Sequence, residues 1–356
     1  MAISDIKAYA HLTQSEIETL CAEMERIRYE ITASLGESDA VYIRRAISTQ
    51  RLLELFGRIL LITERNTAVR VAGIVALAAS KTIENLQLGH NISHGQWDWM
   101  NDPEIHSESW EWDSVGPSSH WRRAHNYLHH YFTNVHGLDP DLGSGVLRMT
   151  RDEPWRPVHM LQPAVTLFHA AIFEWAIAFH HLRGYKRLNG TTRWRLNSLP
   201  NRELARKATA QVLKDYVLFP LLRGRNFRRV LISNAAANLA RNIFMYIGIF
   251  CGHFPDGAEK FTEEEFLSET KGEWYLRQLL GTSNFEAGRV LAFLTGGLCY
   301  QIEHHLFPDL PSNRYPEISS EVQLLCERYD LPYTTGTLVG QFARSFRTVC
   351  KLAFTR

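Results

Sequence analysis

Three short histidine strings contain the residues of this chain that are best suited to chemistry. They are His90-Asn-Ile-Ser-His94, His125-Asn-Tyr-Leu-His129-His130 and Gln301-Ile-Glu-His304-His305. On a helix, residues four positions apart share a face, so that His90 and His94 can face one metal ion, as can His125 and His129. His130 is rotated about 100° further round the helix. The second string can therefore offer ligands to two neighbouring ions.

The number of histidines indicates two metal ions. A structural zinc site takes four ligands and a catalytic zinc site takes three, so the seven histidines of the strings overfill one zinc site. Imidazole binds iron, copper, nickel and zinc, and the spacing leaves the element open. No Glu-x-x-His pair lies within the strings, which excludes the carboxylate di-iron helical bundles as the type of site.

Polar residues beside the strings are candidates for orienting the imidazoles. Asp98, Asn126 and Glu303 lie next to or within the strings, and their oxygen atoms can accept the second ring N–H of a ligand histidine. For Glu303, a charge exposed to solvent explains the sequence equally well. Trp97 and Trp99 follow the first string, and we expect aromatic side chains so close to it to wall an apolar cavity.

The elements that carry the strings are predicted to be helices. A Thr13–Glu16 capping box and apolar residues at helical spacing indicate a helix from Thr13 up to Gly36. Residues 40–62 follow as a basic amphipathic helix, suited either to an anionic membrane surface or to packing with solvated arginines. No repeat or linker interrupts the chain, so we expect an N-terminal amphipathic helix region, residues 1–39, attached to one domain of residues 40–356.

Four apolar segments are candidates for membrane helices, which need about 20 mostly apolar residues. They are Val69–Leu88, Pro157–Leu182, Val230–Phe250 and Gly288–Ile302, of which Pro157–Leu182 is the best by length. The mean hydropathy of the chain is slightly negative, and a soluble helical protein can bury such segments. Hydropathy alone therefore leaves membrane insertion open.

Charge and cysteine usage exclude some classes of protein. Lys and Arg (39) balance Asp and Glu (38), so no overall charge calls for a nucleic-acid partner. The five cysteines are scattered, which argues against a disulfide framework and against thiolate metal sites. No signal peptide is visible. Residues 183–229 hold thirteen Lys or Arg against two acidic residues, which the positive-inside tendency assigns to the cytoplasmic side.

The order and spacing of the strings resemble the three histidine boxes of the integral-membrane fatty-acid desaturases. The string Gln301–Pro308 resembles the third box of the acyl-lipid and linoleoyl-CoA-type branch, and His90–Asp102 and Phe250–Phe261 resemble actinobacterial members. The resemblance implies an all-α, membrane-associated fold in which apolar helices carry a cytoplasmic helical cap with a histidine-ligated dimetal site. It also implies a bacterial inner (plasma) membrane, with the active site facing the cytoplasm.

The resemblance further implies two non-haem iron ions that activate O2 and remove two hydrogens from an acyl chain. One more histidine between the second and third boxes binds iron in family members, and His253 is our choice, with His180 and His181 as alternatives. Gln301 occupies a position that the family fills with His or Gln, as a ligand or as a hydrogen-bond donor. The implied ligands are His90, His94, His125, His129, His130, His253, His304 and His305.

The partners follow from the same resemblance. The substrate is expected to be a fatty acyl-CoA or an acyl-lipid, with membrane lipid around the protein. Two electrons per turnover are expected from a separate ferredoxin or cytochrome b5-type donor with its reductase, because the chain has no His-Pro-Gly-Gly haem string. The basic stretch 183–229 can dock such a donor or acyl-CoA phosphates, or form ordinary membrane-facing surface.

Two other functions and the topology stay open. A hydroxylase or ketolase on the same di-iron scaffold is one alternative, although the third string favours desaturation. A metal-binding membrane protein without redox turnover is the other. Family members have four spanning helices, for which this chain has barely enough apolar length. Either Pro157–Leu182 lies in the membrane surface, or the spans are Val212–Leu222 and Val230–Phe250, joined through Arg223–Arg229.

Overall fold

Helices make up the regular structure of the described chain. The computed structural model describes residues 7–142, 147–188, 198–254 and 258–355. In these residues there is no strand, and the extended contacts are two isolated bridges, Val135 with Phe261 and Glu286 with Thr337. The predicted all-α class is therefore confirmed.

The first helix, α1 (Gln14–Ala33), begins at the predicted capping box. The Glu16 backbone N–H donates to Thr13 Oγ1, and the Thr13 backbone N–H donates to the Glu16 carboxylate. Its apolar face packs on α13 (Lys271–Gly281) and α16 (Tyr315–Arg328), so residues far apart in sequence share one core. The helix predicted after Thr13 is thus confirmed, and it is attached to the body rather than separate.

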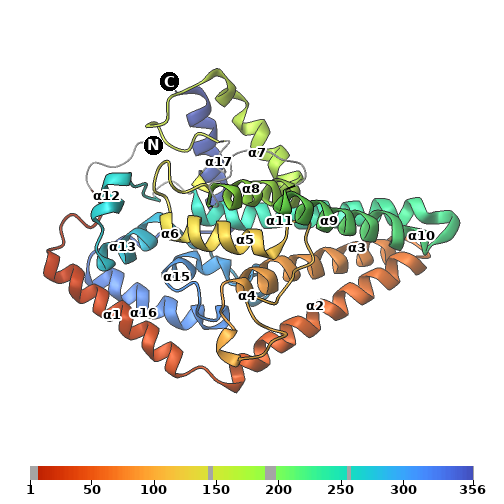
Figure 1. The fold of residues 1–356 in the computed structure, drawn as a ribbon, viewed down its shortest axis with the longest axis horizontal. Helices are drawn as coiled ribbons and strands as arrows, with labels where there is room; N and C mark the ends of the chain where they lie inside the picture. Colours follow the sequence, from red (N-terminus) through yellow and green to blue (C-terminus); the bar gives the residue numbers. More distant parts are fainter. Residues whose placement is uncertain (1–6, 143–146, 189–197, 255–257, 356) are drawn as a thin grey trace.

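Four helical segments lie side by side and extend away from the rest of the molecule (Figure 1). We call this projection the arm and define it as residues 48–82, 208–221 and 227–243. Its helices are α2 (Glu37–Thr63), α3 (Thr67–Thr82), the continuous α9 (Leu199–Leu213), η6 (Lys214–Leu218) and α10 (Phe219–Leu221), and α11 (Phe227–His253).

Large apolar side chains cover much of the outside of the arm, although Arg51, Arg65, Arg228 and Arg229 are also exposed there, and an ion-pair cluster lies inside it. Asp215 lies at its centre, 2.6 Å from Arg58 Nη2 and 2.7 Å from Lys81 Nζ, and all three side chains are buried. For residues 40–62, the alternative of a packed helix with solvated arginines is therefore wrong at Arg58, which is buried and whose partner lies 157 residues later. Large exposed apolar side chains of the arm include Leu52, Leu55, Phe56, Ile59, Val71, Val75, Leu213, Val217, Leu218, Leu221, Ile232, Leu239 and Ile243.

The basic stretch 183–229 does not form a single surface. Its residues 189–197 lie outside the described residues. Arg202 and Arg206 lie on α9, whereas Arg223 and Arg229 lie near Glu64 at the far end of the arm, where Arg223 Nη2 donates to the Glu64 carbonyl at 2.6 Å. Because α9 and α10 run along the arm, the two halves of the stretch lie at different levels of the molecule (Figure 1).

None of the helices in the described residues is by itself long and apolar enough to cross a bilayer. One pair qualifies only when its halves are joined, Pro157–Ala171 with Phe173–Arg183, and these halves bend by 102°. The predicted continuous segment Pro157–Leu182 is therefore wrong: it comprises η5 (Pro157–Leu161), α7 (Gln162–Ala171) and α8 (Phe173–Leu188). At the break, Asn242 Nδ2 donates to the Ala171 carbonyl and Asn242 Oδ1 accepts from the Glu174 N–H, which satisfies the free backbone groups.

The apolar segment Gly288–Ile302 is also broken. Gly296 and Gly297 both have positive φ, which ends one helix and turns the chain into the next. Gly296 also lies against the carbonyl of Leu86, so that a side chain does not fit there. The remaining helices of the described residues are η1 (Ile83–His90), α4 (Asn91–Ser93), η2 (Asp98–Met100), α5 (Ser118–Ala124), η3 (His125–His129), α6 (His130–Phe132), η7 (Gly224–Asn226), α12 (Glu263–Ser268), α14 (Arg289–Leu294), η8 (Leu298–Tyr300), α15 (Gln301–Leu306), η9 (Ser312–Arg314) and α17 (Leu338–Phe354).

Candidate metal centre

The three histidine strings meet where the base of the arm joins the body. The first string begins at the last residue of η1 (Ile83–His90), which continues α3, and runs through α4. The second string follows α5 and begins in η3 (His125–His129). The third string lies in α15, and α11 ends at His253. The eight predicted ligand histidines are all buried. Segments up to 215 positions apart thus bring their imidazoles to one place.

The second string lies in a π-helical turn, which the sequence did not indicate. The His130 N–H donates to the His125 carbonyl, five residues back. This wider turn brings His125 and His130 together, with their Nε2 atoms 3.2 Å apart. His125 and His129 do share a face, as predicted, with their ring centroids 5.0 Å apart. The expectation that His130 turns away from them assumed an α-helix and is wrong.

The ring nitrogens form two groups of histidines alone, in each of which all ligand atoms lie within 4.8 Å of one another, and a third group joins His125 and His129 to the Asp141 carboxylate. His130 lies between the groups, with its ring centroid 4.6 Å from that of His94 and 4.4 Å from that of His305. The second string does reach both groups, as predicted for two ions. One group is His90, His94, His125 and His304, and the other is His129, His253 and His305.

Buried ring nitrogens of these groups have no hydrogen-bond partner among the described residues. They include Nε2 of His94, His129 and His305. Two other nitrogens, Nε2 of His90 and of His304, face each other at 3.1 Å. A buried polar atom without a partner costs about 1–3 kcal/mol, so this arrangement is unfavourable unless cations occupy it. The residues present therefore fit a pair of metal ions.

Side chains outside the strings hold the opposite ring nitrogens. His129 Nδ1 donates to Asp139 at 3.0 Å, and His305 Nδ1 donates to Gln278 Oε1 at 3.1 Å. Such bonds fix the tautomer and direct the other nitrogen toward a metal. Sequence reasoning missed both partners. Asp139 lies ten residues after His129, whereas nothing in the sequence connects Gln278 with the third string.

Two predicted orienting residues contact other groups instead. Asp98 accepts from the Ser107 N–H at 2.8 Å and from Ser107 Oγ at 2.6 Å. Asn126 Nδ2 donates to the Ser93 carbonyl at 3.0 Å, which ties the second string to the first. Neither bond reaches a clustered imidazole.

Glu303 is buried and fastens α15 to the body. It accepts from Asn284 Nδ2 and from the Tyr333 hydroxyl, both at 2.8 Å, and Asn284 Oδ1 in turn accepts from the Ile302 N–H. The alternative of a solvent-exposed charge is wrong. Burial raises the pKa of Glu303 to about 7, and neither of these two bonds is to a histidine ring.

His253 lies in the cluster, and its two alternatives lie beside it. The His253 ring centroid is 4.7 Å from that of His129 and 5.1 Å from that of His305. Gln301 Nε2 lies 3.0 Å from His253 Nε2. His180 Nε2 instead donates to Asp141 at 2.6 Å, and His181 lines the adjoining pocket. The geometry therefore favours His253 as the additional histidine.

Burial keeps most of the clustered imidazoles neutral. It lowers the pKa of His90, His94 and His304 well below the usual value, and neighbouring histidines lower it further. The same holds for His130, His253 and His305. Burial also disfavours the charged form of His129, but Asp139 and Asp141 outweigh this effect and raise its pKa. Neutral imidazole is the form that binds metals.

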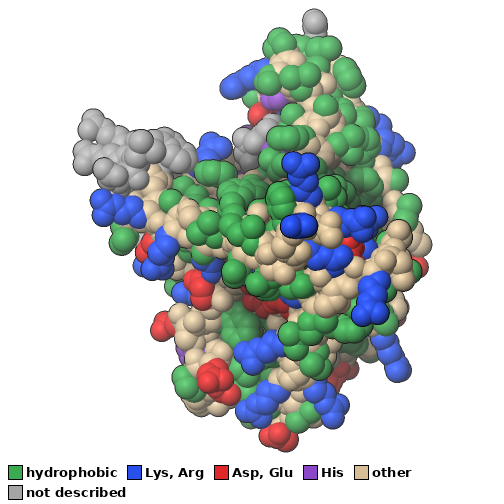
Figure 2. Space-filling view, turned by 90° about the vertical axis from the view of Figure 1, so that its right-hand side faces the viewer, with side chains coloured by type: hydrophobic (Ala, Val, Ile, Leu, Met, Phe, Trp, Pro, Cys, Tyr) green, Lys and Arg blue, Asp and Glu red, His purple; other side chains and the backbone are tan. Residues whose placement is uncertain are grey.

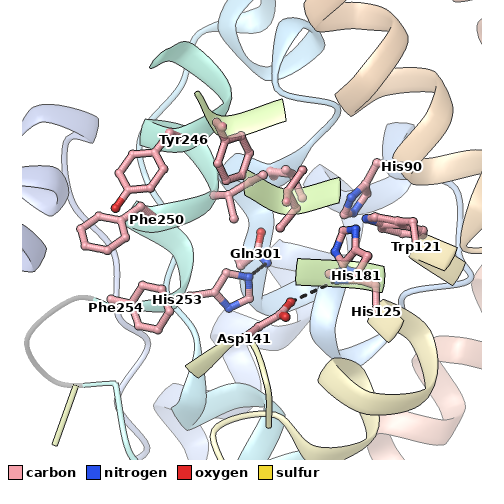
Figure 3. Close-up of a pocket in the computed structure, with 14 residues that line it drawn as sticks. His90, Trp121, His125, Asp141, His181, Tyr246, Phe250, His253, Phe254 and Gln301 are labelled. Atoms are coloured by element: carbon pink, nitrogen blue, oxygen red, sulfur yellow. Dashed lines mark hydrogen bonds and ion pairs between the residues drawn. The ribbon is translucent and has the colours of Figure 1, made fainter. Parts of the chain in front are cut away.

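A pocket with apolar walls opens beside the first histidine group. Tyr246, Phe250 and Phe254 lie along one wall, and His90 and His125 lie opposite (Figure 3). Trp121 stacks on His125 with centroids 4.4 Å apart; the expected aromatic wall is thus formed here rather than by Trp97 and Trp99. The enclosed part of this pocket measures about 70 Å³, and the pocket is open at its mouth. Its apolar walls suit a short part of an alkyl chain held against metal ions.

The sequence matches proteins of known activity over most of its length. Residues 66–337 match the fatty acid desaturase family. The chain is 50% identical over 357 residues to the NADPH-dependent stearoyl-CoA 9-desaturase of Mycobacterium tuberculosis, covering 99% of this chain and 84% of that protein. It is 25% identical over 291 residues to the sn-1 linoleoyl-lipid 6-desaturase of Synechocystis, covering 78% and 79%. The chain therefore belongs to the fatty acid desaturase family and is an oxidoreductase that introduces a double bond into a fatty acyl chain.

Proposed function

We propose that this desaturase acts on a long-chain fatty acyl-CoA at two iron ions. The observation that carries the centre is the convergence of buried imidazole nitrogens without partners. Iron fits better than zinc, which has no redox chemistry. The mycobacterial relative, named for stearoyl-CoA, is twice as similar as the lipid-specific one, which supports acyl-CoA. The proposed ligands are His90, His94, His125, His129, His130, His253, His304 and His305.

The balance of the reaction defines what else is needed. O2 takes up four electrons and four protons when it becomes two waters, and the two C–H bonds that are lost supply two of each. The remaining two electrons come from a separate ferredoxin or cytochrome b5-type donor, and two protons come from solvent. The NADPH in the name of the mycobacterial relative supports a reductase upstream of that donor. Bound iron supplies the activation of O2.

The residues of this chain hold and orient the reacting groups. Phe250, Phe254 and Leu298 bind methylene groups and exclude water from the pocket. Asp139 holds the Nδ1 proton of His129, so that Nε2 is available to metal. Gln301, three residues before His304, is a positioning residue rather than a ligand. Its amide Nε2 lies within hydrogen-bond distance of His253 Nε2, at 3.0 Å, and so orients the His253 ring.

Proteins of this family are generally membrane-associated, and we infer that the arm enters the bilayer. Its exposed apolar side chains suit lipid. Residues 48–63, the part of α2 that lies in the arm, form about 24 Å of helix at 1.5 Å per residue, which reaches through most of a hydrocarbon core about 30 Å thick. The histidines at the base of the arm then face the cytoplasm of a bacterial inner membrane. The core that α1 shares with α13 and α16 supports one domain, with residues 1–39 attached to residues 40–356.

Expression in a host without desaturases tests the function. The fatty acids of the cells are analysed by mass spectrometry, and the purified protein is assayed for bound metal. We expect a product 2 Da lighter than the saturated acid and two irons per chain. A product 16 Da heavier would instead indicate a hydroxylase on the same scaffold. One metal or none, with no consumption of O2 in the presence of reductant and stearoyl-CoA, would contradict the proposal.

A further inference from the structure

A second pocket lies next to the one at the histidines. Its lining includes His169 and Ile172 at the end of α7, and Ala176, Phe179 and Arg183 on α8. Phe173, Ile177 and Tyr246 line both pockets. A single layer of side chains therefore separates the outer pocket from the space that reaches His90 and His125.

The surface beside the outer pocket is apolar. Apolar residues recur here at the spacing of one helical face, at positions 157, 160, 161, 164, 167 and 168. Contiguous exposed apolar surface of this kind marks a membrane or partner contact. The apolar side chains that are at least half exposed here are Val158, Met160, Leu161, Leu167, Phe168 and, on α8, Phe179.

The apolar surface of η5 and α7 faces the direction in which the arm extends. Figure 2 views the molecule from that side, and its upper part, where α7 lies in Figure 1, presents mostly hydrophobic side chains. The helix α7 also runs across the long direction of the arm (Figure 1). A bilayer that surrounds the arm therefore meets the exposed face of α7 along its length, as it meets an interfacial amphipathic helix.

The opposite side of the same segment is fixed to the body of the protein. Gln162 Nε2 donates to the Val349 carbonyl at 3.3 Å, and Trp155 Nε1 donates to the Ala353 carbonyl at 2.8 Å, both on α17. These bonds and the 102° bend at Ile172 hold α7 against the protein instead of in line with α8. The bent geometry favours the membrane surface for residues 157–182, and the segments Val212–Leu222 and Val230–Phe250, the alternative spans that the sequence left open, lie largely in the arm.

We propose that η5 and α7 lie in the lipid interface and that the outer pocket is a portal that takes an acyl chain from the lipid layer. The chain enters between α7 and α8 and passes the layer formed by Phe173, Ile177 and Tyr246 to reach the histidines. Rotation of these side chains opens the layer. This inference rests on the proposed acyl substrate and adds the route by which that substrate arrives.

Depth-dependent quenching tests the lipid contact. In a full-length chain with Cys21→Ser and Cys350→Ser, a fluorophore is attached at Phe168→Cys or, as the control, at Leu324→Cys, which is 55% exposed on α16. The proteins are reconstituted in phosphatidylcholine–phosphatidylglycerol vesicles that contain lipid spin-labelled near the headgroup. We expect quenching at position 168 and none at position 324. Equal quenching at both positions, or none at 168, would overturn the interfacial placement.

Photolabelling tests the portal. A diazirine-bearing stearoyl-CoA is added to the reconstituted, iron-loaded enzyme, and we expect crosslinks on the peptides that contain Phe173–Phe179 and Tyr246. Ala176→Trp, which fills the outer pocket only, is expected to reduce the crosslinks at Tyr246 and kcat/KM at least tenfold, whereas Ala205→Trp on the exposed face of α9 leaves both unchanged. An active wild-type enzyme that is labelled elsewhere would overturn the portal alone. A wild-type enzyme that never desaturates would instead overturn the proposed function.

Discussion

At the scale of single residues, the centre depends on which nitrogen of each imidazole is already bonded. His129 and His305 have their Nδ1 atoms held by Asp139 and Gln278, and His304 Nδ1 lies 3.0 Å from the Tyr315 hydroxyl. In each case Nε2 is left for metal. Because these bonds fix the tautomers and the ring orientations in the folded protein, little further conformational entropy is lost when a metal ion binds.

Removing one ligand is expected to empty the centre. His94→Ala and His129→Ala each delete a nitrogen that has no partner but metal, so we expect loss of iron and a fall in activity of more than about 100-fold. Iron per chain by mass spectrometry and product by gas chromatography measure this. The control is His11→Ala, an exposed histidine outside the cluster. Full activity in either ligand variant would refute the assignment.

Asp139→Asn tests the orienting bond separately from the ligands. An amide at this position holds His129 Nδ1 less strongly and also removes the negative charge that raises the pKa of His129. We expect iron affinity to fall about 10- to 100-fold, measured by competition with a chelator. Asp309→Asn, which removes only a surface partner of Arg28, serves as the control. Unchanged affinity in Asp139→Asn would show that Asp139 does not orient the ring.

The metal-free protein is expected to lose stability in acid. Seven clustered histidines have pKa values lowered in the folded chain, against about 6.5 when unfolded; they are His90, His94, His125, His130, His253, His304 and His305. As pH falls through 6.5, the unfolded chain binds protons that the folded chain does not bind, which costs up to about 1.4 kcal/mol per group and pH unit. His129 has a raised pKa and acts in the opposite direction, but it is one group against seven.

Thermal unfolding of the metal-free protein measures this effect. We expect a lower midpoint at about pH 5.5 than at about pH 7.5, on either side of the unfolded pKa. Protein loaded with iron before the change of pH is the comparison, because bound metal occupies the same nitrogens. Equal midpoints for the metal-free protein at the two values would mean that the folded histidines accept protons without cost.

At the scale of elements, the sequence predicted the helices and the meeting of the strings better than their local geometry. The spacing of the histidines identifies the ligands because each string spans only five or six residues. The same spacing cannot distinguish an α-helical turn from the π-helical turn of η3, since polar and apolar residues occupy nearly the same sequence positions in both. Asp139 and Gln278 were missed for another reason. Their contacts with the imidazoles arise only after distant helices pack, so that no local pattern records them.

The close approach of two elements at Gly296 gives a prediction at this scale. Gly296 has a positive φ and lies against the Leu86 carbonyl in η1, and its own carbonyl accepts from Asn91 Nδ2 between the two histidines of the first string. Gly296→Ala is therefore expected to displace η1, lowering the unfolding midpoint and the iron content together.

Gly248→Ala is the matched control for that change. Gly248 lies within α11, and a Cβ there meets nothing within 4 Å, so alanine is expected to be neutral or to stabilise the helix by up to about 1 kcal/mol. Thermal unfolding and metal analysis of both variants provide the measurement. If Gly296→Ala behaves like Gly248→Ala, the turn does not position the first string.

At the scale of the whole molecule, the arm explains why hydropathy gave no clear membrane spans. Its apolar side chains face outward, whereas Arg58, Lys81, Asp215, Glu174 and Arg241 are buried between its helices or at its base. Hydropathy averaged along one helix mixes the two faces and falls below the level of a membrane span. The outward face becomes visible only when the helices are assembled, which is why the sequence left the topology open.

The inner charges of the arm are expected to be essential to its packing. Asp215 neutralises Arg58 and Lys81 at 2.6 and 2.7 Å, and Asn238 Nδ2 donates to it at 3.1 Å. Asp215→Asn leaves two buried cations side by side, which costs about 3–5 kcal/mol when one partner of a buried pair is removed. We expect a lower unfolding midpoint in detergent, with unchanged iron content in the protein that remains folded.

A second variant separates this charge effect from simple loss of a side chain. Asp215→Asn combined with Lys81→Met removes one cation as well, so that a single buried charge, Arg58, remains near Glu54. Because the repulsion between two cations is gone, the double variant is expected to recover part of the lost stability. If the double variant is less stable than Asp215→Asn alone, or if Asp215→Asn unfolds like the wild type, then the ion pairs do not stabilise the arm, and its helices are held together by apolar packing instead.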